Sequence, residues 1–359
     1  MHVGTAKSAP GELVTGWFEV TDLPTGSPER LPVLIADGER DGPTLWITAA
    51  IHGDEVTAMA AAQDVMSETI ELSIAGTVVC LPNLNPAGLR RTTRTSYYHD
   101  DDPNRHFPDP DAESTRPPRV QELIDERVYE AFADSADALV DLHTAQVGSV
   151  PFVIRDRVLY GTERDEGEAR ELAADLERLV DAFDLPVVNE YAAEEYTDQN
   201  LQRSTAGAAL NNAGIPAFTV ELGSHTVVEE DNRELGVRGV VNVLRELGMV
   251  DGEPEPLGVE SPVDFPVKRA VHPHTDVAGI VRHRVEAGDV VEAGDVVADV
   301  LTPHGERKAA VESEHDGYVL GRHEGVAAYE NDPLASLAVR DEGDLVVPRD
   351  DESDEDGAT

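Results

Sequence analysis

The chain has 359 residues and carries 72 acidic against 28 basic side chains, a formal net charge of −44 at pH 7. Nucleic-acid binding depends on clustered cationic side chains, so this charge excludes nucleic acid as a partner. No apolar stretch reaches the roughly 18 residues that a spanning helix needs. The N-terminus also lacks a signal-peptide pattern, so we expect a soluble, cytoplasmic protein without membrane association.

The acidic residues are spread along the whole sequence instead of forming one tail. Such a charge strains a compact fold by self-repulsion at low salt. At about 1 M salt the Debye length falls to roughly 3 Å, and the repulsion is largely screened. The composition therefore predicts a halophilic protein, suited to a high-salt cytoplasm such as that of haloarchaea. The single cysteine, Cys80, lies in the apolar run TVVCLPN and is expected to be buried.

Short β-rich runs alternate with helix-like stretches between residues 44 and 250. Strands are expected at 44–50, 77–82, 136–142 and 215–222, and helices at 55–71, 119–133, 165–183 and 231–247. In the second helix Val120, Leu123, Ile124 and Val128 recur at helical spacing. This alternation is typical of an α/β fold, with a mostly parallel sheet flanked by helices.

The pattern of hydrophobic residues changes after residue 250. Residues 251–262, DGEPEPLGVESP, have no periodicity and predict a linker. Residues 263–348 contain short valine-rich runs separated by Gly-Asp turns, including a tandem EAGDVV at 286–297, which predict an all-β barrel-sandwich domain. We therefore expect an α/β domain at 1–250, the linker, the β domain and a disordered acidic tail at 349–359.

Polar residues stand at the ends of three predicted strands. His52 follows the strand at 44–50, His143 follows the strand at 136–142, and Glu221 lies near the end of the strand at 215–222. In an open parallel sheet, ligands bind beyond the carboxyl ends of the strands. These side chains are thus expected to gather at one edge of the sheet.

The stretch AAIHGDEVTAM (49–59) contains a possible half of a metal site. Hydrolytic zinc takes three His or carboxylate ligands and keeps a fourth position for water. His52 and Glu55 could supply two ligands and His143 the third, with Glu221 as the carboxylate that transfers the proton. The apolar AFTV before Glu221 predicts the partial burial that raises a carboxylate pKa. Alternatively, Asp54 or Glu55 is simply a favourable acid in the first turn of a helix.

Residues 83–108 form a connection that is too long for a simple turn, which favours a functional loop. The loop concentrates arginines in an otherwise acidic chain: Arg90, Arg91, Arg94 and Arg105. Arginine binds carboxylates through two parallel hydrogen bonds, so this reversal of charge suggests an anionic substrate group. For Arg90 or Arg91 the alternative is a surface ion pair with the aspartates at 100–102.

The motifs HGDE, NPAG, TTR, DPNRHFP, DLHT and VELG follow one another in an order that resembles the succinylglutamate desuccinylase and aspartoacylase family, relatives of the zinc carboxypeptidases. The resemblance spans roughly residues 30 to 250. It implies a zinc-dependent amide hydrolase with a carboxypeptidase-like α/β fold at 1–250 and one Zn²⁺ ion per chain. The SYYHDDD segment after the TTR motif is longer than the corresponding spacing in aspartoacylase.

The resemblance also implies roles for individual residues. The zinc ligands would be His52, Glu55 and His143, and Glu221 would be the general base and acid. Arg94 would polarise the scissile carbonyl and stabilise the oxyanion. The substrate carboxylate would be bound by Asn104 and Arg105.

Four further residues are candidates for the site. Asp141 shares a strand face with His143 and is placed to orient that ligand, although an ordinary buried polar contact is the alternative. Tyr97, Tyr98 and His225 are candidates for lining the pocket.

The C-terminal part resembles the barrel-sandwich domains of biotinyl and lipoyl carriers, with Lys308 near the position of a carrier's modified lysine. The sequence lacks the Met-Lys pair of biotin carriers. The favoured interpretation is that this domain packs beside the zinc site and narrows access to it.

These observations predict a zinc-dependent deacylase that hydrolyses the amide of a small N-acyl amino acid or related compound, a small-molecule substrate with a carboxylate. One alternative is a metallocarboxypeptidase acting on short peptides. Another is a non-catalytic ligand-binding or lipoyl-carrier-like protein. The sequence does not indicate an oligomeric state.

Overall fold

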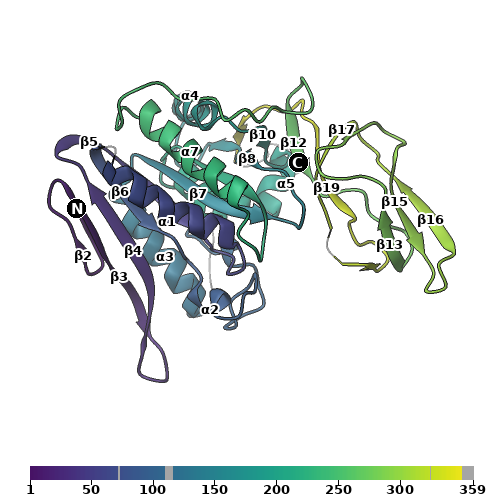
Figure 1. The fold of residues 1–359 in the computed structure, drawn as a ribbon, viewed down its shortest axis with the longest axis horizontal. Helices are drawn as coiled ribbons and strands as arrows, with labels where there is room; N and C mark the ends of the chain where they lie inside the picture. Colours follow the sequence, from purple (N-terminus) through teal and green to yellow (C-terminus); the bar gives the residue numbers. More distant parts are fainter. Residues whose placement is uncertain (72, 110–115, 324, 350–359) are drawn as a thin grey trace, which may run out of the picture.

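The computed structural model describes residues 1–71, 73–109, 116–323 and 325–349. Two hairpins open the chain and are formed by β1 (His2–Val3) with β2 (Ala6–Lys7) and by β3 (Glu12–Asp22) with β4 (Pro28–Asp37). The long β3–β4 hairpin reaches beyond the body of the molecule (Figure 1). These N-terminal strands were not predicted from the sequence.

The predicted alternation of strands and helices is found between residues 40 and 246. The strands are β5 (Arg40–Ala49), β6 (Ala75–Leu81), β7 (Ala138–Ala145) and β11 (Ala217–Ser224), and the long helices are α1 (Val56–Glu71), α3 (Val120–Ala133), α4 (Glu166–Phe183) and α7 (Glu230–Glu246). Shorter elements fill the connections: α2 (Pro86–Leu89), η1 (Pro103–Arg105), β8 (Phe152–Arg155), β9 (Val158–Tyr160), β10 (Val187–Asn189), α5 (Ala193–Asp198), η2 (Leu201–Arg203) and α6 (Thr205–Asn211).

The central sheet has the order β14-β17-β19-β12-β10-β8-β11-β7-β5-β6-β4-β3. Strands β6, β5, β7 and β11 pair in parallel, as predicted. The N-terminal hairpin adds antiparallel pairs at one end, and β8 pairs antiparallel with β11. Beyond β8 the pairing is parallel again, from β8 to β10 and from β10 to β12. The sheet is therefore mixed, and the expectation of a mostly parallel sheet was right for these two stretches but not for the antiparallel ends, where tight hairpins can join neighbours without a crossover helix.

Helices cover both faces of the parallel centre. Helix α1 packs against α7, and α7 packs against α4, on one face, while α3, which contacts α6, lies on the other (Figure 1). Aromatic rings fill the two layers: Trp46 of β5 meets Phe132 of α3, and Phe218 of β11 meets Phe183 of α4, both edge to face. Cys80 is fully buried, as expected. None of the helices in the described part of the chain is long and apolar enough to span a membrane.

The C-terminal residues form strands without helices among those described. They are β12 (Val267–Ala270), β13 (Gly279–His283), β14 (Val290–Val291), β15 (Val296–Leu301), β16 (Arg307–Glu312), β17 (Gly317–Arg322), β18 (Ala327–Ala328), β19 (Ala335–Arg340) and β20 (Val346–Pro348). Figure 1 shows β13, β15 and β16 at the end of the molecule farthest from the N-terminal hairpin.

These strands divide between sheets. β16, β15, β13 and β18 form a four-stranded sheet, whereas β12, β19, β17 and β14 extend the central sheet beyond β10. The predicted all-β texture is thus present, but part of it continues the α/β sheet, because β12 pairs with the edge strand β10 and covers its free backbone groups. Residues 251–262 contain no helix or strand, and residues 350–359 of the predicted acidic tail lie outside the described residues.

A candidate metal and substrate site

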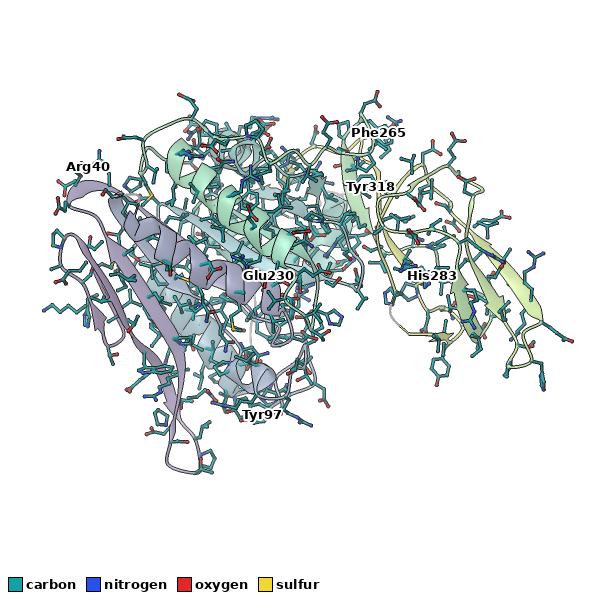
Figure 2. The ribbon with its side chains drawn as sticks, viewed as in Figure 1. Arg40, Tyr97, Glu230, Phe265, His283 and Tyr318 are labelled. Atoms are coloured by element: carbon teal, nitrogen blue, oxygen red, sulfur yellow. The ribbon has the colours of Figure 1, made fainter. Side chains whose placement is uncertain are left out.

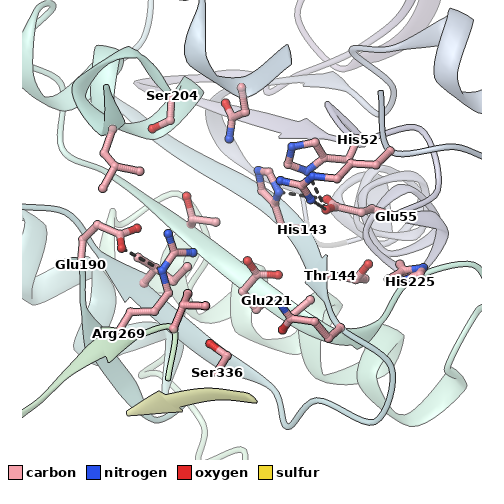
Figure 3. A pocket seen from close by; sticks show the side chains of 18 of the residues that line it. His52, Glu55, His143, Thr144, Glu190, Ser204, Glu221, His225, Arg269 and Ser336 are labelled. Atoms are coloured by element: carbon pink, nitrogen blue, oxygen red, sulfur yellow. Dashed lines mark hydrogen bonds and ion pairs between the residues drawn. The ribbon is translucent and has the colours of Figure 1, made fainter. Parts of the chain in front are cut away.

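Three buried side chains meet at the carboxyl end of the parallel strands. Nδ1 of His52 lies 2.6 Å from Oε1 of Glu55, and Nδ1 of His143 lies 2.9 Å from Oε2 of the same carboxylate (Figure 3). The three residues are at most 3% exposed. We refer to His52, Glu55 and His143 as the triad.

The turn after β5 places two members of the triad. Gly53 approaches α2 so closely that a Cβ atom there would lie 2.2 Å from the backbone of Gly88. The side chain of Asn85 caps α2 and donates from Nδ2 to the carbonyl of Ile51 at 3.1 Å and to that of Arg94 at 3.3 Å. The HGDE and NPAG motifs therefore form one tightly packed corner, which ties the triad to the loop that carries Arg94.

Two carboxylates contact the histidine nitrogens that face away from Glu55. Asp141 accepts from Nε2 of His143 at 2.8 Å, as the strand face predicted. Asp102 lies 3.0 Å from Nε2 of His52 and also accepts from Arg94 at 2.9 Å. Carboxylates that hydrogen-bond the outer nitrogen of a metal-binding histidine fix its tautomer and orientation. This role of Asp102 was not predicted, although its position in DPNR, two residues before Asn104, was a usable signal.

The triad has the chemistry of a divalent-cation site. Its ligand atoms lie within 4.8 Å of one another. Burial alone would raise the pKa of Glu55, but His52 and His143 outweigh it and hold that pKa well below its usual range. The buried Oε2 of Glu55 has no hydrogen-bond partner among the described residues, although His143 is adjacent. Two histidines and an ionised carboxylate match the donor set of catalytic zinc.

Replacing Asp141 with asparagine is expected to weaken metal binding by about 10- to 100-fold. Thr48 donates to Oδ1 of Asp141 at 2.7 Å, so the new amide would turn its NH₂ toward Nε2 of His143. Nε2 would then have to accept, and the ring proton would move to Nδ1, the nitrogen that faces Glu55. Competition with a chromogenic chelator measures the change. The control is Asp137→Asn, whose carboxylate accepts from the Thr44 amide at the opposite end of the sheet; equal affinities in both variants would contradict the role.

Glu221 is presented beside the triad by the neighbouring strand. In the parallel β7–β11 pair it is in register with His143, so both point from the same edge of the sheet. It is 8% exposed, and its Oε2 has no hydrogen-bond partner among the described residues. Burial raises the pKa of Glu221 to about 6 against the opposing effect of His143. The carboxylate is thus free, close and tuned for proton transfer near neutral pH.

The triad and Glu221 open into a cavity of about 510 Å³. Arg94, Asn104 and Arg105, from the long arginine-rich connection, line it. Nη1 of Arg94 lies 3.6 Å from Glu55 despite the longer SYYHDDD segment. Oδ1 of Asn104 accepts from the amide and hydroxyl of Thr205, which leaves Nδ2 to face the cavity. The structure therefore brings the predicted metal ligands, Glu221 and the three predicted substrate-contacting residues of this connection around one cavity.

Other members of the same connection have structural contacts. Arg90 pairs with the fully buried Glu29 at 3.2 Å, not with the aspartates at 100–102. The hydroxyl of Tyr98 also donates to Glu29, and Tyr97, which is 44% exposed, lies on the surface near α2 (Figure 2). Neither tyrosine lines the cavity, whereas His225 does. The expectation for the two tyrosines was wrong, because a carboxylate on β4 draws this part of the loop away from the site.

The far side of the cavity contains charged residues that the sequence analysis did not find. Arg269 of β12 pairs with Glu190 at 2.9 Å. Asp156 accepts from the hydroxyl of Tyr196 at 2.8 Å, and burial, followed by the nearby Glu190, raises the Asp156 pKa to about 7. Val271, His323 and Ser336 of the C-terminal part also line the cavity. No local sequence pattern links these residues, because the pairing of β10 with β12 brings them together.

The chain is similar to proteins of known name. A curated relative, N-alpha-acetyl-L-2,4-diaminobutyric acid deacetylase of Halomonas elongata, is 26% identical over 304 residues, covering 83% of this chain and 82% of the relative.

Solved structures show the same fold. The product-bound ectoine utilization protein EutE (DoeB) from Ruegeria pomeroyi has a TM-score of 0.74 at 21% identity and covers 94% of this chain and 100% of that chain. A succinylglutamate desuccinylase/aspartoacylase from Rhodobacter sphaeroides has a TM-score of 0.73 at 21% identity and covers 92% and 96%, respectively.

The profile of the succinylglutamate desuccinylase/aspartoacylase catalytic domain matches residues 41–247. This range holds β5 to α7, and with them the triad, Glu221 and the arginine-rich connection. The chain belongs to the succinylglutamate desuccinylase/aspartoacylase family.

Proposed function

We propose that this protein is a zinc-dependent deacylase that hydrolyses the amide bond of a small N-acyl amino acid. The observation that carries the proposal is the convergence of the triad and the free Glu221 carboxylate in one cavity with Arg94 and Arg105. The name of the Halomonas relative supports the substrate class, since that protein is a deacetylase of an N-acetylated amino acid.

In this proposal, His52, Glu55 and His143 hold one zinc ion. A bound zinc ion lowers the pKa of its water from 15.7 to about 7 and polarises a carbonyl. Glu221 takes the proton of the attacking water and returns it to the nitrogen of the leaving amine. Its unpartnered Oε2 and its raised pKa suit both transfers.

The arginine-rich connection supplies charge stabilisation and orientation. Arg94 donates to the oxyanion that develops on the acyl carbonyl, while Asp102 holds its guanidinium at 2.9 Å. Nδ2 of Asn104 and the guanidinium of Arg105 bind the carboxylate of the amino acid. Arg105 forms no ion pair with a described residue, so a substrate carboxylate would be its counter-ion.

We also assign catalysis to residues 1–250 and closure of the substrate side to residues 263–348, joined by a linker at 251–262. C-terminal residues line the cavity, which favours small compounds over the peptides of a metallocarboxypeptidase. The carrier alternative is not favoured, because Lys308 lies within β16 and donates to the carbonyl of Ala278 instead of standing at the tip of a hairpin.

A substrate panel tests the proposal in high-salt buffer with added zinc. It contains Nα-acetyl-L-2,4-diaminobutyrate, N-acetyl-L-aspartate and N-succinyl-L-glutamate beside unacylated dipeptides. We expect release of the free amino acid from at least one N-acyl compound and none from the dipeptides. Hydrolysis of the dipeptides alone would replace the deacylase with a carboxypeptidase.

A further inference from the structure

Arg269 enters the cavity from the C-terminal strand β12, on the side opposite His52 and Glu55 (Figure 3). Its Nε lies 2.9 Å from Oε1 of Glu190, and its guanidinium carbon is 4.9 Å from the ring centroid of Tyr191. The ion pair with Glu190 fixes the Nε edge of the guanidinium, and the ring of Tyr191 covers one of its faces. The side chain is 21% exposed, and its exposure is to the cavity it lines.

The guanidinium of Arg269 has donors that no described residue satisfies with a hydrogen bond. A guanidinium has five N–H groups in a rigid fork, four of them on the two amino nitrogens. Neither amino nitrogen forms a hydrogen bond within the part of the chain that the structure describes, and Nε is buried without a hydrogen-bond partner despite its ion pair with Glu190. Glu190 is already engaged, since its Oε1 also accepts from the amide of Tyr191 at 3.2 Å. A largely buried guanidinium with free donors is costly unless a ligand satisfies them.

Arg105 provides a second guanidinium in the same cavity. Its one hydrogen bond with a described residue runs from Nη1 to the carbonyl of Asn104 at 2.6 Å. Both arginines line this cavity, and burial, the largest effect, together with the charge of Arg269 lowers the pKa of Arg105 against the opposing charge of Asp102. Two cations with free donors around one space favour an anion between them.

We infer that Arg269 is a substrate-binding residue which, with Arg105, clamps the carboxylate of the amino acid, and that Glu190 is the positioning residue that holds its guanidinium. The C-terminal β strands thus contribute half of the carboxylate site. The inference rests on the proposed function for the identity of the ligand, and it extends that function by making recognition depend on both parts of the chain.

This clamp predicts a specific kinetic signature. The carboxylate is distant from the reacting bond and is bound equally in the ground state and the transition state, so its loss raises KM and leaves kcat nearly unchanged. A hydrogen bond to a charged group contributes about 1.5–3 kcal/mol, which corresponds to about 10- to 100-fold in affinity. A carboxamide in place of the carboxylate lacks the charge, so Arg269 should matter little for it.

The test compares Arg269→Gln and Arg269→Lys with the wild type on Nα-acetyl-L-2,4-diaminobutyrate and on its α-carboxamide, in high-salt buffer. We expect Arg269→Gln to raise KM for the carboxylate by about 10- to 100-fold and to change kcat and the carboxamide reaction by less than about threefold. Arg269→Lys should recover part of the loss, because lysine keeps the charge but not the fork. Arg307→Gln removes an exposed arginine of β16 and serves as the matched control.

A parallel loss on both substrates, or an unchanged KM for the carboxylate, would overturn the clamp. Calorimetric binding of the same compound in a Glu221→Gln background makes the result independent of turnover. If the wild type hydrolyses nothing but the compound binds and Arg269→Gln weakens that binding, the deacylase proposal fails and the clamp stands. Absence of binding as well as turnover would reject both.

Discussion

Replacing Glu221 with glutamine is expected to lower kcat by about 10²- to 10⁴-fold, the usual contribution of a positioned general base and acid. Glutamine keeps the volume and the polarity of the side chain but cannot accept the proton of the attacking water. The triad is untouched, so metal content should remain that of the wild type. Steady-state kinetics and metal analysis of the same preparation measure both quantities.

The pH dependence of the wild type gives a second measure of the same carboxylate. The base form of Glu221 is required, and burial raises its pKa to about 6, so kcat/KM should be full above that pH and fall as the pH drops through it. In Glu221→Gln the residual activity should lack this acid limb. Glu171→Gln, an exposed change on α4, is the control and should behave as the wild type. A normal kcat in Glu221→Gln would assign proton transfer to another group.

His52→Ala and His143→Ala are each expected to abolish zinc binding and activity together. Each removes one of three protein ligands, so the loss of affinity should exceed the roughly 100-fold upper limit seen for residues that merely orient a ligand. The wild type should carry about one zinc per chain, as expected for a three-ligand catalytic site. Plasma emission spectrometry after dialysis gives the metal content, and circular dichroism confirms that each variant is folded.

His304→Ala is the control, because it removes a histidine that lies outside the triad. His304 is exposed at the turn between β15 and β16 and should leave zinc content and activity unchanged. A folded wild type that takes up no zinc would contradict the metal site. His52 and Glu55 would then be residues at the beginning of α1, and the deacylase proposal would lose its main support.

Much of the α/β fold could be predicted from the sequence, because hydrophobic residues recur at different spacings in strands and in helices. Helix α3 illustrates the point, since Ile124 and Val128, spaced at helical intervals, are fully buried against the sheet. The long β3–β4 hairpin was not predicted. Its strands are only partly buried, so they lack the continuous apolar runs that mark the parallel centre of the sheet.

For the candidate site too, features set by a single element could be predicted, whereas contacts between elements distant in sequence could not. The ends of β5, β7 and β11 were readable as strand ends, so the sequence already placed His52, His143 and Glu221 at one edge. The long-range ion pairs of the arginine-rich connection and of the cavity could not be predicted. Pairing of Arg90 with Glu29 and of Arg269 with Glu190 joins residues far apart in the chain, and charged side chains in so acidic a sequence have many alternative partners.

The sequence by itself determined the family, the parallel centre of the sheet and the residue types of the triad, because these depend on short motifs and on periodicity within single elements. The tertiary structure alone decided that Asp102 supports both His52 and Arg94, and that β12 continues the central sheet and brings Arg269 into the cavity. The physical reason is that strand pairing and burial act on elements distant in sequence, and their partners are selected by the packing of the whole chain.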